Sequence, residues 1–243
     1  MKKILILTLV AIVSLCGAQA QKKTTNKNNS KTTVTNRIPL PDGTPRTDAA
    51  NLETLETIEL PMSYEGLHAP LVEALKERRT IRNIREEDLP LEYVASLLWS
   101  AYGYNRPDEM KRVAPSAVNV QEFDLYLFTR EGIYLYDAAK NAIHLVVKGD
   151  HRKEISQQKH FAVAPISIVM VANYDRMGVF KNTEDRDFYA AVDAGYISQN
   201  IYLFCASAKL GTVACGGIDR DTIHKLLNIK NGRALLAHPV GMQ

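Results

Sequence analysis

The part of this chain that most limits its possible folds is the segment DFYAAVDAGYISQNIYLFCASAK, residues 187–209. Its composition predicts one long helix that is apolar on nearly every side. Such a helix is buried, so it must lie inside the domain or in an interface between subunits. Asp193 and Asn200 are seven residues apart on one face of this helix, and polar pairs of this kind can fix the register of an interface. We therefore predict an obligate homodimer.

Shorter helices and strands surround this helix in the sequence. The segments APLVEALKERR and LPLEYVASLLWSAYGYN have apolar residues at helical spacing. Strands are predicted at 123–129, 132–137, 142–148 and 165–173, with DAAKNA as a hairpin connection between the second and the third. A strand, two glycines, a helix capped by Asp219 and a last strand RALLAHPVG complete the chain. Helices packed on a mixed sheet make this an α+β fold.

The first twenty residues have the features of a signal peptide. Lys2 and Lys3 precede an apolar run over residues 4–15, and Ala18-Gln19-Ala20 forms a small-x-small cleavage site. The apolar run is too short to span a bilayer. Cys16 raises the question of a lipid anchor, but the leucine before it is bulkier than lipoprotein processing usually accepts. We expect an exported protein, periplasmic or secreted, rather than one anchored through Cys16.

Two further segments follow the leader. Residues 21–36 are polar, low in complexity and without periodicity, which is typical of a disordered tether. Residues 37–66 contain several prolines and are predicted to lie extended on the surface. The folded domain is predicted to span residues 67–243, and 46% hydrophobic residues in a chain of 243 suit one sizeable domain.

Charge and cysteine content exclude several functions. Without Lys2 and Lys3 of the leader, 28 of the 30 basic residues remain against 27 acidic ones, a net charge of +1. Such a balance does not indicate nucleic acid or an anionic membrane as partner. Cys205 and Cys215 remain after the leader; they could pair in an exported protein, but we expect two buried, unpaired thiols.

Common catalytic and metal-binding motifs are absent from the sequence. There is no GxxxxGK[ST], HExxH, GxSxG or G-x-G-x-x-G pattern. The six histidines, at positions 68, 144, 151, 160, 224 and 238, lack the spacing of metal ligands, so no metal site is predicted.

Three polar clusters remain. Arg78, Arg79, Thr80 and Arg82 follow the first predicted helix, and in an extended chain alternate positions would project to one side and could enclose a phosphate. Alternatively, these cations only offset the dipole of the helix. The second cluster lies in PSAVNVQ, residues 115–121, whose residue types also suit an ordinary loop. The third is Cys215-Gly216-Gly217, where a flat group could approach the backbone, unless the glycines only form a tight turn.

The order of these clusters resembles the nitroreductase family of flavin enzymes. The resemblance rests on Arg-Arg-Thr-x-Arg after the first helix, Pro-Ser-x-x-Asn-x-Gln before a strand, and the long apolar helix leading to Gly-Gly-Ile-Asp. It covers about residue 67 to the end of the chain. The segments LLWSAYGYN, GIYLYDAAKNAIHLVVKGDHR and ETIELP are most similar to the SagB-type branch, which includes azoline dehydrogenases. Val118-Asn119 departs from the small Gly-Ala pair expected in that branch.

The resemblance implies a mostly antiparallel sheet, an intertwined homodimer and an FMN site at the subunit interface. It assigns the FMN phosphate and ring edge to Arg78, Arg79, Thr80 and Arg82. It assigns the lining of a flavin held mainly by the other subunit to Pro115, Ser116 and Asn119. It places Gln157 near the flavin pyrimidine, and Cys215, Gly216 and Gly217 at its reactive edge. No catalytic side chain is expected, because the flavin carries the hydride chemistry.

The implied function is an FMN-dependent oxidoreductase that acts on a small aromatic or conjugated acceptor, such as a nitro compound or a quinone. The alternatives are a SagB-type dehydrogenase of a small or peptide-derived substrate, and a flavin-binding protein without turnover. Members of the family usually end with basic residues that complete the phosphate site, whereas this sequence reads Pro239-Val240-Gly241-Met242-Gln243. Phosphate binding is therefore expected to depend on residues 78–82.

Overall fold

The computed structural model describes residues 56–61 and 69–243. The predicted leader and residues 21–55 of the predicted lead-in lie outside the described residues. Within the described ranges, none of the helices combines the length and apolar character needed to cross a membrane.

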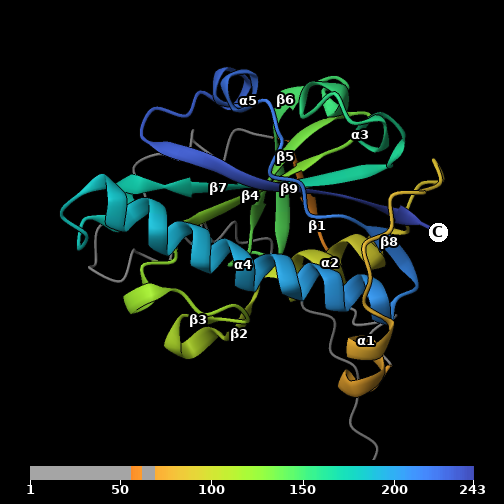
Figure 1. Cartoon of the computed structure of the whole chain (residues 1–243), viewed down its shortest axis with the longest axis horizontal. Helices are drawn as coiled ribbons and strands as arrows, with labels where there is room; N and C mark the ends of the chain where they lie inside the picture. The colour runs from red at the N-terminus through yellow and green to blue at the C-terminus, as the bar shows by residue number, and fades with distance from the viewer. Residues whose placement is uncertain (1–55, 62–68) are drawn as a thin grey trace, which may run out of the picture. The chain divides into compact units, whose positions relative to one another are not determined.

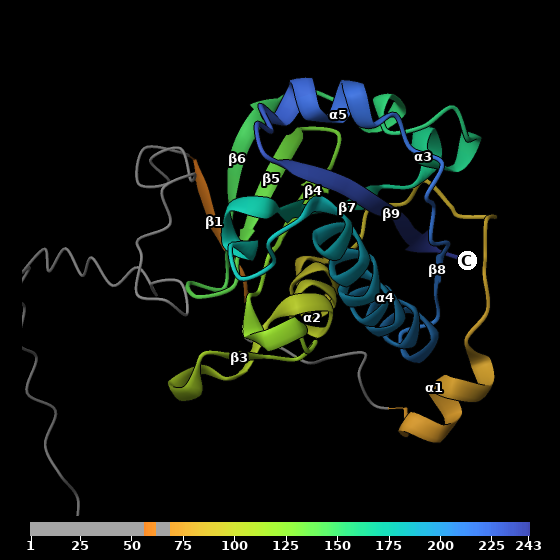
Figure 2. The same ribbon diagram turned by 60° about the vertical axis from the view of Figure 1, so that its left-hand side comes forward.

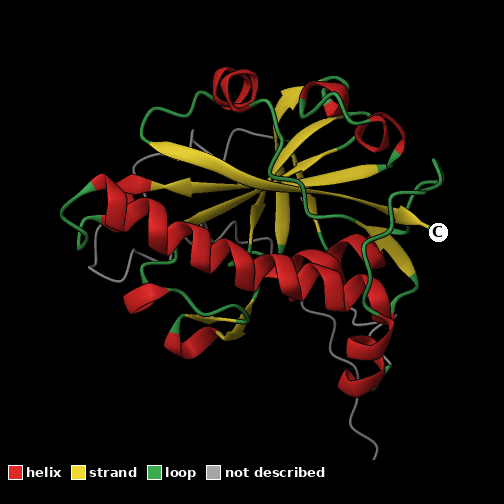
Figure 3. Cartoon of the chain, in the orientation of Figure 1, coloured by secondary structure: helices red, strands yellow, loops and turns green. Residues whose placement is uncertain are grey.

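A seven-stranded sheet with the order β1-β6-β5-β4-β7-β9-β8 forms the centre of the domain (Figures 1 and 3). Every neighbouring pair in it is antiparallel. The strands are β1 (Thr57–Glu59), β4 (Phe123–Phe128), β5 (Gly132–Asp137), β6 (Ala142–Lys148), β7 (Ile166–Asn173), β8 (Leu210–Thr212) and β9 (Gly232–Met242). The predicted α+β class and the predicted strands from β4 to β7 are confirmed, and β5 and β6 form the predicted hairpin.

Helices cover both faces of this sheet. Figure 2 shows α2 (Leu91–Tyr102) and α4 (Thr183–Ser207) on one face, and α3 (Lys159–Val163) and α5 (Arg220–Leu227) on the other. Side chains of β7 alternate accordingly: Ile168 and Met170 belong to the core under α2 and α4, and Val169 and Val171 to the core under α5. Asp219 caps α5 as predicted, because its side chain accepts a hydrogen bond from the Thr222 N–H.

Some elements were not predicted. Residues 57–59, expected to precede the domain, form the edge strand β1 and pair with β6, so the sheet begins before Leu67. A small second sheet joins β2 (Tyr104–Arg106) to β3 (Lys111–Arg112), and the short helix α3 precedes β7. These elements are too short to show a periodic pattern.

The long helix α4 begins four residues before the predicted start, at Thr183, where the Asn182 side chain accepts a hydrogen bond from the Asp185 N–H. Its buried face includes Ala194, Ile197 and Ile201, which lie in the core. Its opposite face leaves large apolar side chains in solvent: Phe188 is 61% exposed, Val192 37% and Tyr196 47%. The helix is therefore only half covered within one chain.

The prediction that Asp193 fixes the register of a subunit interface is wrong. Its side chain is only 3% exposed within its own chain, and its Oδ2 accepts a hydrogen bond of 2.8 Å from the Ala117 N–H. Asp193 therefore faces the loop before β4 and not a second subunit, because it lies on the buried side of α4.

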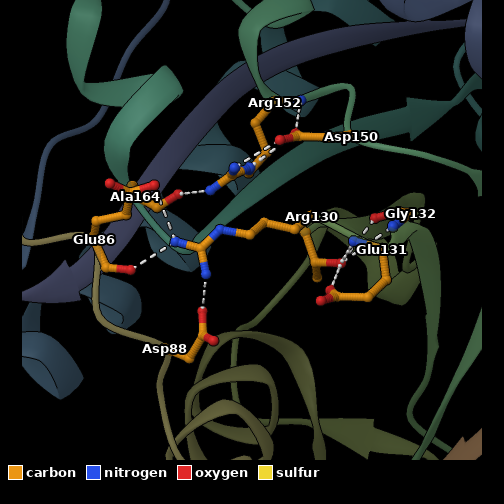
Figure 4. Close-up of polar contacts among 9 residues, drawn as sticks. Glu86, Asp88, Arg130, Glu131, Gly132, Asp150, Arg152 and Ala164 are labelled. Atoms are coloured by element: carbon orange, nitrogen blue, oxygen red, sulfur yellow. Dashed lines mark hydrogen bonds and ion pairs between the residues drawn. The ribbon is translucent and has the colours of Figure 1, made fainter.

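An extended segment, residues 78–90, links α1 (Leu71–Glu77) to α2 and is fastened to the sheet at several points. The Ile81 N–H donates to Thr212 O of β8, and the Arg85 N–H donates to Met242 O of β9. Figure 4 shows Arg130 of the β4–β5 hairpin bound to Glu86 and Asp88, which lie in the same segment. These contacts fix the path of the chain that carries Arg78 and Arg82.

Beside Arg130, the buried Arg152 binds both carboxylate oxygens of Asp150 and donates to Ala164 O at 2.8 Å (Figure 4). The guanidinium holds the pKa of Asp150 below its usual value. This ion pair ties the turn after β6 to the end of α3.

Gly241 is predicted to be essential for the path of residues 78–85. A Cβ at this position would lie 2.6 Å from Ile84 Cγ2 and 2.7 Å from Pro165 Cδ. Gly241→Ala should therefore lower the free energy of unfolding by about 1–3 kcal/mol, measured by chemical denaturation. Gly178→Ala is the control, because nothing lies within 4 Å of its Cβ position. Equal stability of both variants would contradict the close packing of Ile84 on β9.

Candidate functional site

Tyr202 of α4 joins two of the predicted clusters. The Arg78 guanidinium lies over its ring, 5.2 Å from the centroid, and the hydroxyl groups of Thr80 and Tyr202 are 3.0 Å apart. The Tyr202 hydroxyl also accepts a hydrogen bond of 2.9 Å from the Ala214 N–H, directly before Cys215. One side chain thus connects the Arg78–Arg82 segment with the segment of the double glycine.

Arg82 extends this connection to Cys215. Burial raises the pKa of the Cys215 thiol, and the charge of Arg82 acts against this rise. The thiol lies 3.5 Å from His160 Nε2. Burial, and secondly Arg82, lower the pKa of His160, so its imidazole is neutral near pH 7. Arg79 differs from its neighbours, because it pairs with Glu77 at 3.1 Å.

The two glycines of the third cluster are exposed and have open space above them. A Cβ on Gly216 would first meet Leu236 at 3.7 Å, and a Cβ on Gly217 would first meet Gln158 Nε2 at 3.6 Å. The carbonyl oxygens are engaged elsewhere: Gly217 O accepts from Ser156 Oγ at 2.8 Å, and Gly216 O accepts from Arg220 at 3.0 Å. The protein itself therefore does not require glycine here for packing.

The amide side chain next to this cluster is Gln158. Its Oε1 lies 3.9 Å from the Cys215 sulfur, and its Nε2 is the atom nearest to the open face of Gly217. Gln157, the residue singled out from the sequence, is exposed just before it. Sequence reasoning therefore missed Gln158, His160 and Tyr202. Two signals were available in the sequence: the adjacent pair Gln157-Gln158, either of which could have been the amide, and the hydroxyl of Tyr202 within an apolar helix.

The 115–121 loop is held by its own side chains. Ser116 Oγ accepts from the Gln121 N–H at 3.0 Å, and Asn119 Oδ1 accepts from Gln121 Nε2 at 3.2 Å. Arg112, buried against the rings of Tyr102 and Tyr104, donates to Gln121 Oε1 at 2.9 Å.

The backbone of this loop is strained. Val118, Asn119 and Gln121 have φ angles of 43°, 60° and 50°, in the left-handed region that non-glycine residues seldom adopt. Each such residue costs about 1–3 kcal/mol and persists only where its surroundings enforce it. Val118 is 72% exposed, so this strained backbone conformation leaves an apolar side chain in solvent.

Within one chain, the 115–121 loop and the arginine cluster lie apart. The loop contacts α4 at Asp193, whereas the cluster contacts α4 at Tyr202. Nine residues of helix separate these contacts, about 13 Å along its axis. Arg78, Thr80, Arg82 and Cys215–Gly217 form one group, and Pro115, Ser116 and Asn119 form another.

A hollow in the described surface includes Arg79 in its lining. It is lined by Glu77, Arg79, Ile81, Tyr202, Cys205, Ala206, Lys209, Leu210 and Gln243. Arg79 is balanced here by Glu77, which leaves Lys209 as the unbalanced positive charge of the lining, and Gln243 closes one side by donating to Leu210 O at 3.0 Å. Cys205 and Cys215 are both free and buried, which confirms the expectation that they do not pair.

Comparison with known proteins gives a consistent result. Residues 75–242 match the nitroreductase family. A nitroreductase-family protein of Methanocaldococcus jannaschii is 32% identical over 200 residues, which cover 78% of this chain and 97% of that protein. The crystal structure of a related protein from Ralstonia eutropha has a TM-score of 0.72 at 31% identity and covers 76% of this chain and 89% of that one. The NADPH:FMN oxidoreductase of Vibrio harveyi shares the fold, with a TM-score of 0.53 at 20% identity over 71% of this chain and 68% of that one.

Proposed function

The chain belongs to the nitroreductase family of oxidoreductases, and we propose on this basis that it is an FMN-dependent enzyme that acts as a homodimer. Its acceptor is a small aromatic or conjugated molecule, such as a nitro compound or a quinone. The observation that carries the proposal is the group formed around Tyr202: the half-buried Arg78 over its ring, the Thr80 hydroxyl, the exposed Arg82 two residues further on, and an open double glycine.

The residues present fit FMN. Guanidinium and hydroxyl donors at Arg78, Thr80 and Arg82 suit a phosphate, which prefers charge-assisted and bidentate hydrogen bonds. The open faces of Gly216 and Gly217 suit a flat ring, and the Gln158 amide can both donate to and accept from the polar edge of that ring.

A homodimer would complete this site. The 115–121 loop is about 13 Å along α4 from the arginine cluster, too far to complete the site of its own chain. The exposed apolar side chains of α4, which include Phe188, Val192 and Tyr196, offer a surface for a second copy. In this proposal the loop of one subunit lines the FMN held mainly by the other.

The bound FMN supplies the transfer of hydride or electrons. The chain itself binds the phosphate through Arg78 and Arg82, keeps the backbone at Gly216 and Gly217 free of side chains, and orients the ring through Gln158. No acid–base side-chain pair is required for this function. If the protein is exported, as its first twenty residues predict, the scarcity of nicotinamides outside the cytoplasm implies another electron donor.

Gly217→Val tests the proposal at the ring. The change should leave folding and the phosphate contacts intact, because the added atoms would have Gln158 Nε2 as their nearest neighbour, at 3.6 Å from Cβ. Oxidation of dithionite-reduced enzyme by a nitroaromatic or a quinone should slow by at least about tenfold, about 1.4 kcal/mol of transition-state stabilisation. Stopped-flow flavin absorbance measures this rate, and Gly178→Val is the matched control away from the site.

Two results would contradict the proposal. A purified protein that neither contains flavin nor binds added FMN would not be a flavoenzyme. A reduced enzyme that reacts with these acceptors no faster than free reduced FMN would favour the SagB-type dehydrogenase or the flavin-binding protein without turnover.

A further inference from the structure

A buried acidic pair lies beneath the 115–121 loop. Glu122, the residue that joins this loop to β4, has an exposed fraction of 0%, and Asp193 of α4 has one of 3%. Neither Glu122 carboxyl oxygen has a well-formed hydrogen bond from another described residue, and the one backbone donor near the carboxyl is the N–H of Glu122 itself. Isolated buried carboxylates are costly, so this carboxyl group needs a cation, hydrogen-bond donors or a proton.

No described cation neutralises Glu122. The charge of Arg176, which follows β7, lowers the pKa of Glu122, but both of its contacts with Asp124 are 2.8 Å, so its charge is already largely balanced. Towards Glu122 it donates only to the backbone oxygen, at 3.2 Å. Arg112, the next guanidinium, is bonded to Gln121 and to Tyr102 O. The Tyr102 hydroxyl of α2 faces the same space without a hydrogen-bond partner among the described residues.

The remaining neighbour is Asp193, which cannot share this space with a second negative charge. Burial is the largest cause that raises the pKa of Glu122; the charge of Asp193 and a hydrogen bond to it add to the rise, its own backbone N–H and Arg176 oppose it, and the pKa is about 8. Burial raises the pKa of Asp193 as well, whereas the Ala117 N–H, which donates to its Oδ2 at 2.8 Å, and the hydrogen bond with Glu122 lower it, so Asp193 is the member that keeps its charge. That N–H belongs to the first residue of the turn Ala117–Asn119, which its own preceding residue, Ser116, does not cap.

We propose that Glu122 is a protonated acid that donates its proton to the Asp193 carboxylate, and that this pair is the positioning device for the strained 115–121 loop. One negative charge shared by two carboxyl groups then caps the turn from α4. Loss of the Glu122 proton would place two buried negative charges side by side and would release the loop. The consequence for FMN binding rests on the proposed function, whereas the pair itself does not.

The titration of Glu122 can be observed in the unmodified full-length protein. Carbon-13 NMR of protein labelled at the glutamate carboxyl carbon should show one protonated acid at pH 7, titrating near pH 8. Glu122→Gln should remove this signal, and Glu92→Gln, at an exposed position, should keep it. Asp193→Asn should shift the titration to lower pH, because a like charge is lost. If every glutamate in the unmodified protein titrates in the ordinary range, the proposal is overturned, and this result does not depend on whether any variant folds.

Stability and loop exchange give independent readouts. The folded state holds a proton that unfolded Glu122 releases above about pH 4.5, so this group's contribution to stability falls as the pH rises from there to about 8. Glu122→Gln should flatten that slope and should keep the Ala117 amide protected from hydrogen exchange above pH 8. Unchanged slope and unchanged exchange in Glu122→Gln would overturn the proposal. FMN titration at pH 7 and pH 9 is a separate arm: if the NMR titration is found but FMN affinity is insensitive to pH, the pair stands and the assignment of the loop to the flavin site fails.

Discussion

Replacing both Arg78 and Arg82 with alanine is expected to weaken FMN binding by at least about 100-fold. Each guanidinium can make charge-assisted, bidentate bonds to a phosphate, worth about 1.5–3 kcal/mol apiece. The structure supports this pair over Arg79, which is already paired with Glu77. Arg78 is held over the Tyr202 ring, so little conformational entropy should be lost when it binds a phosphate.

Fluorescence titration of the apoprotein with FMN measures this effect. Arg85→Ala is the matched control, because Arg85 lies in the same extended segment but is exposed and pairs with Glu87. Unchanged affinity in the double variant, with native stability, would mean that the arginines only offset the dipole of α1.

If the protein is the homodimer proposed above, charges placed on the exposed apolar face of α4 are expected to dissociate it. Val192 and Tyr196 are one helical turn apart, and both remain accessible within one chain. Val192→Glu combined with Tyr196→Glu would bury two unpaired carboxylates in the proposed interface and should raise its dissociation constant at least about 100-fold. FMN affinity should fall with it, because each site would lose the loop of the other subunit.

Light scattering at micromolar concentration, with FMN present, measures the assembly. Val179→Glu is the control, because Val179 is an exposed valine that precedes α4 and lies off this face. A monomer mass for the unmodified protein under these conditions would contradict both the homodimer and the shared site.

The local sequence determined the longer secondary-structure elements and the broad class of the fold, whereas the short elements β1, β2, β3 and α3 were not predicted. The bounds of β5 and β6 match their prediction, and the Asp219 cap was visible because capping depends on neighbours a few residues away. The arginine and glycine clusters were singled out from the sequence as candidates through the order of motifs that resembles the family, and their role in binding FMN stays a prediction. The end of α1 at Glu77 and the extended chain after it place Arg78 and Thr80 against the same ring, as the alternation of an extended chain requires.

Only the tertiary structure decided how these parts meet. Tyr202 and Gln158 became site residues through contacts with segments far away in the sequence, and Asp193 proved to face its own loop and not a partner. Glutamate at the start of a strand is usually exposed to solvent, but Glu122 is fully buried. A sequence pattern records which faces are apolar, but it does not record which buried polar group lies opposite another, because that depends on how α4 and β4 pack.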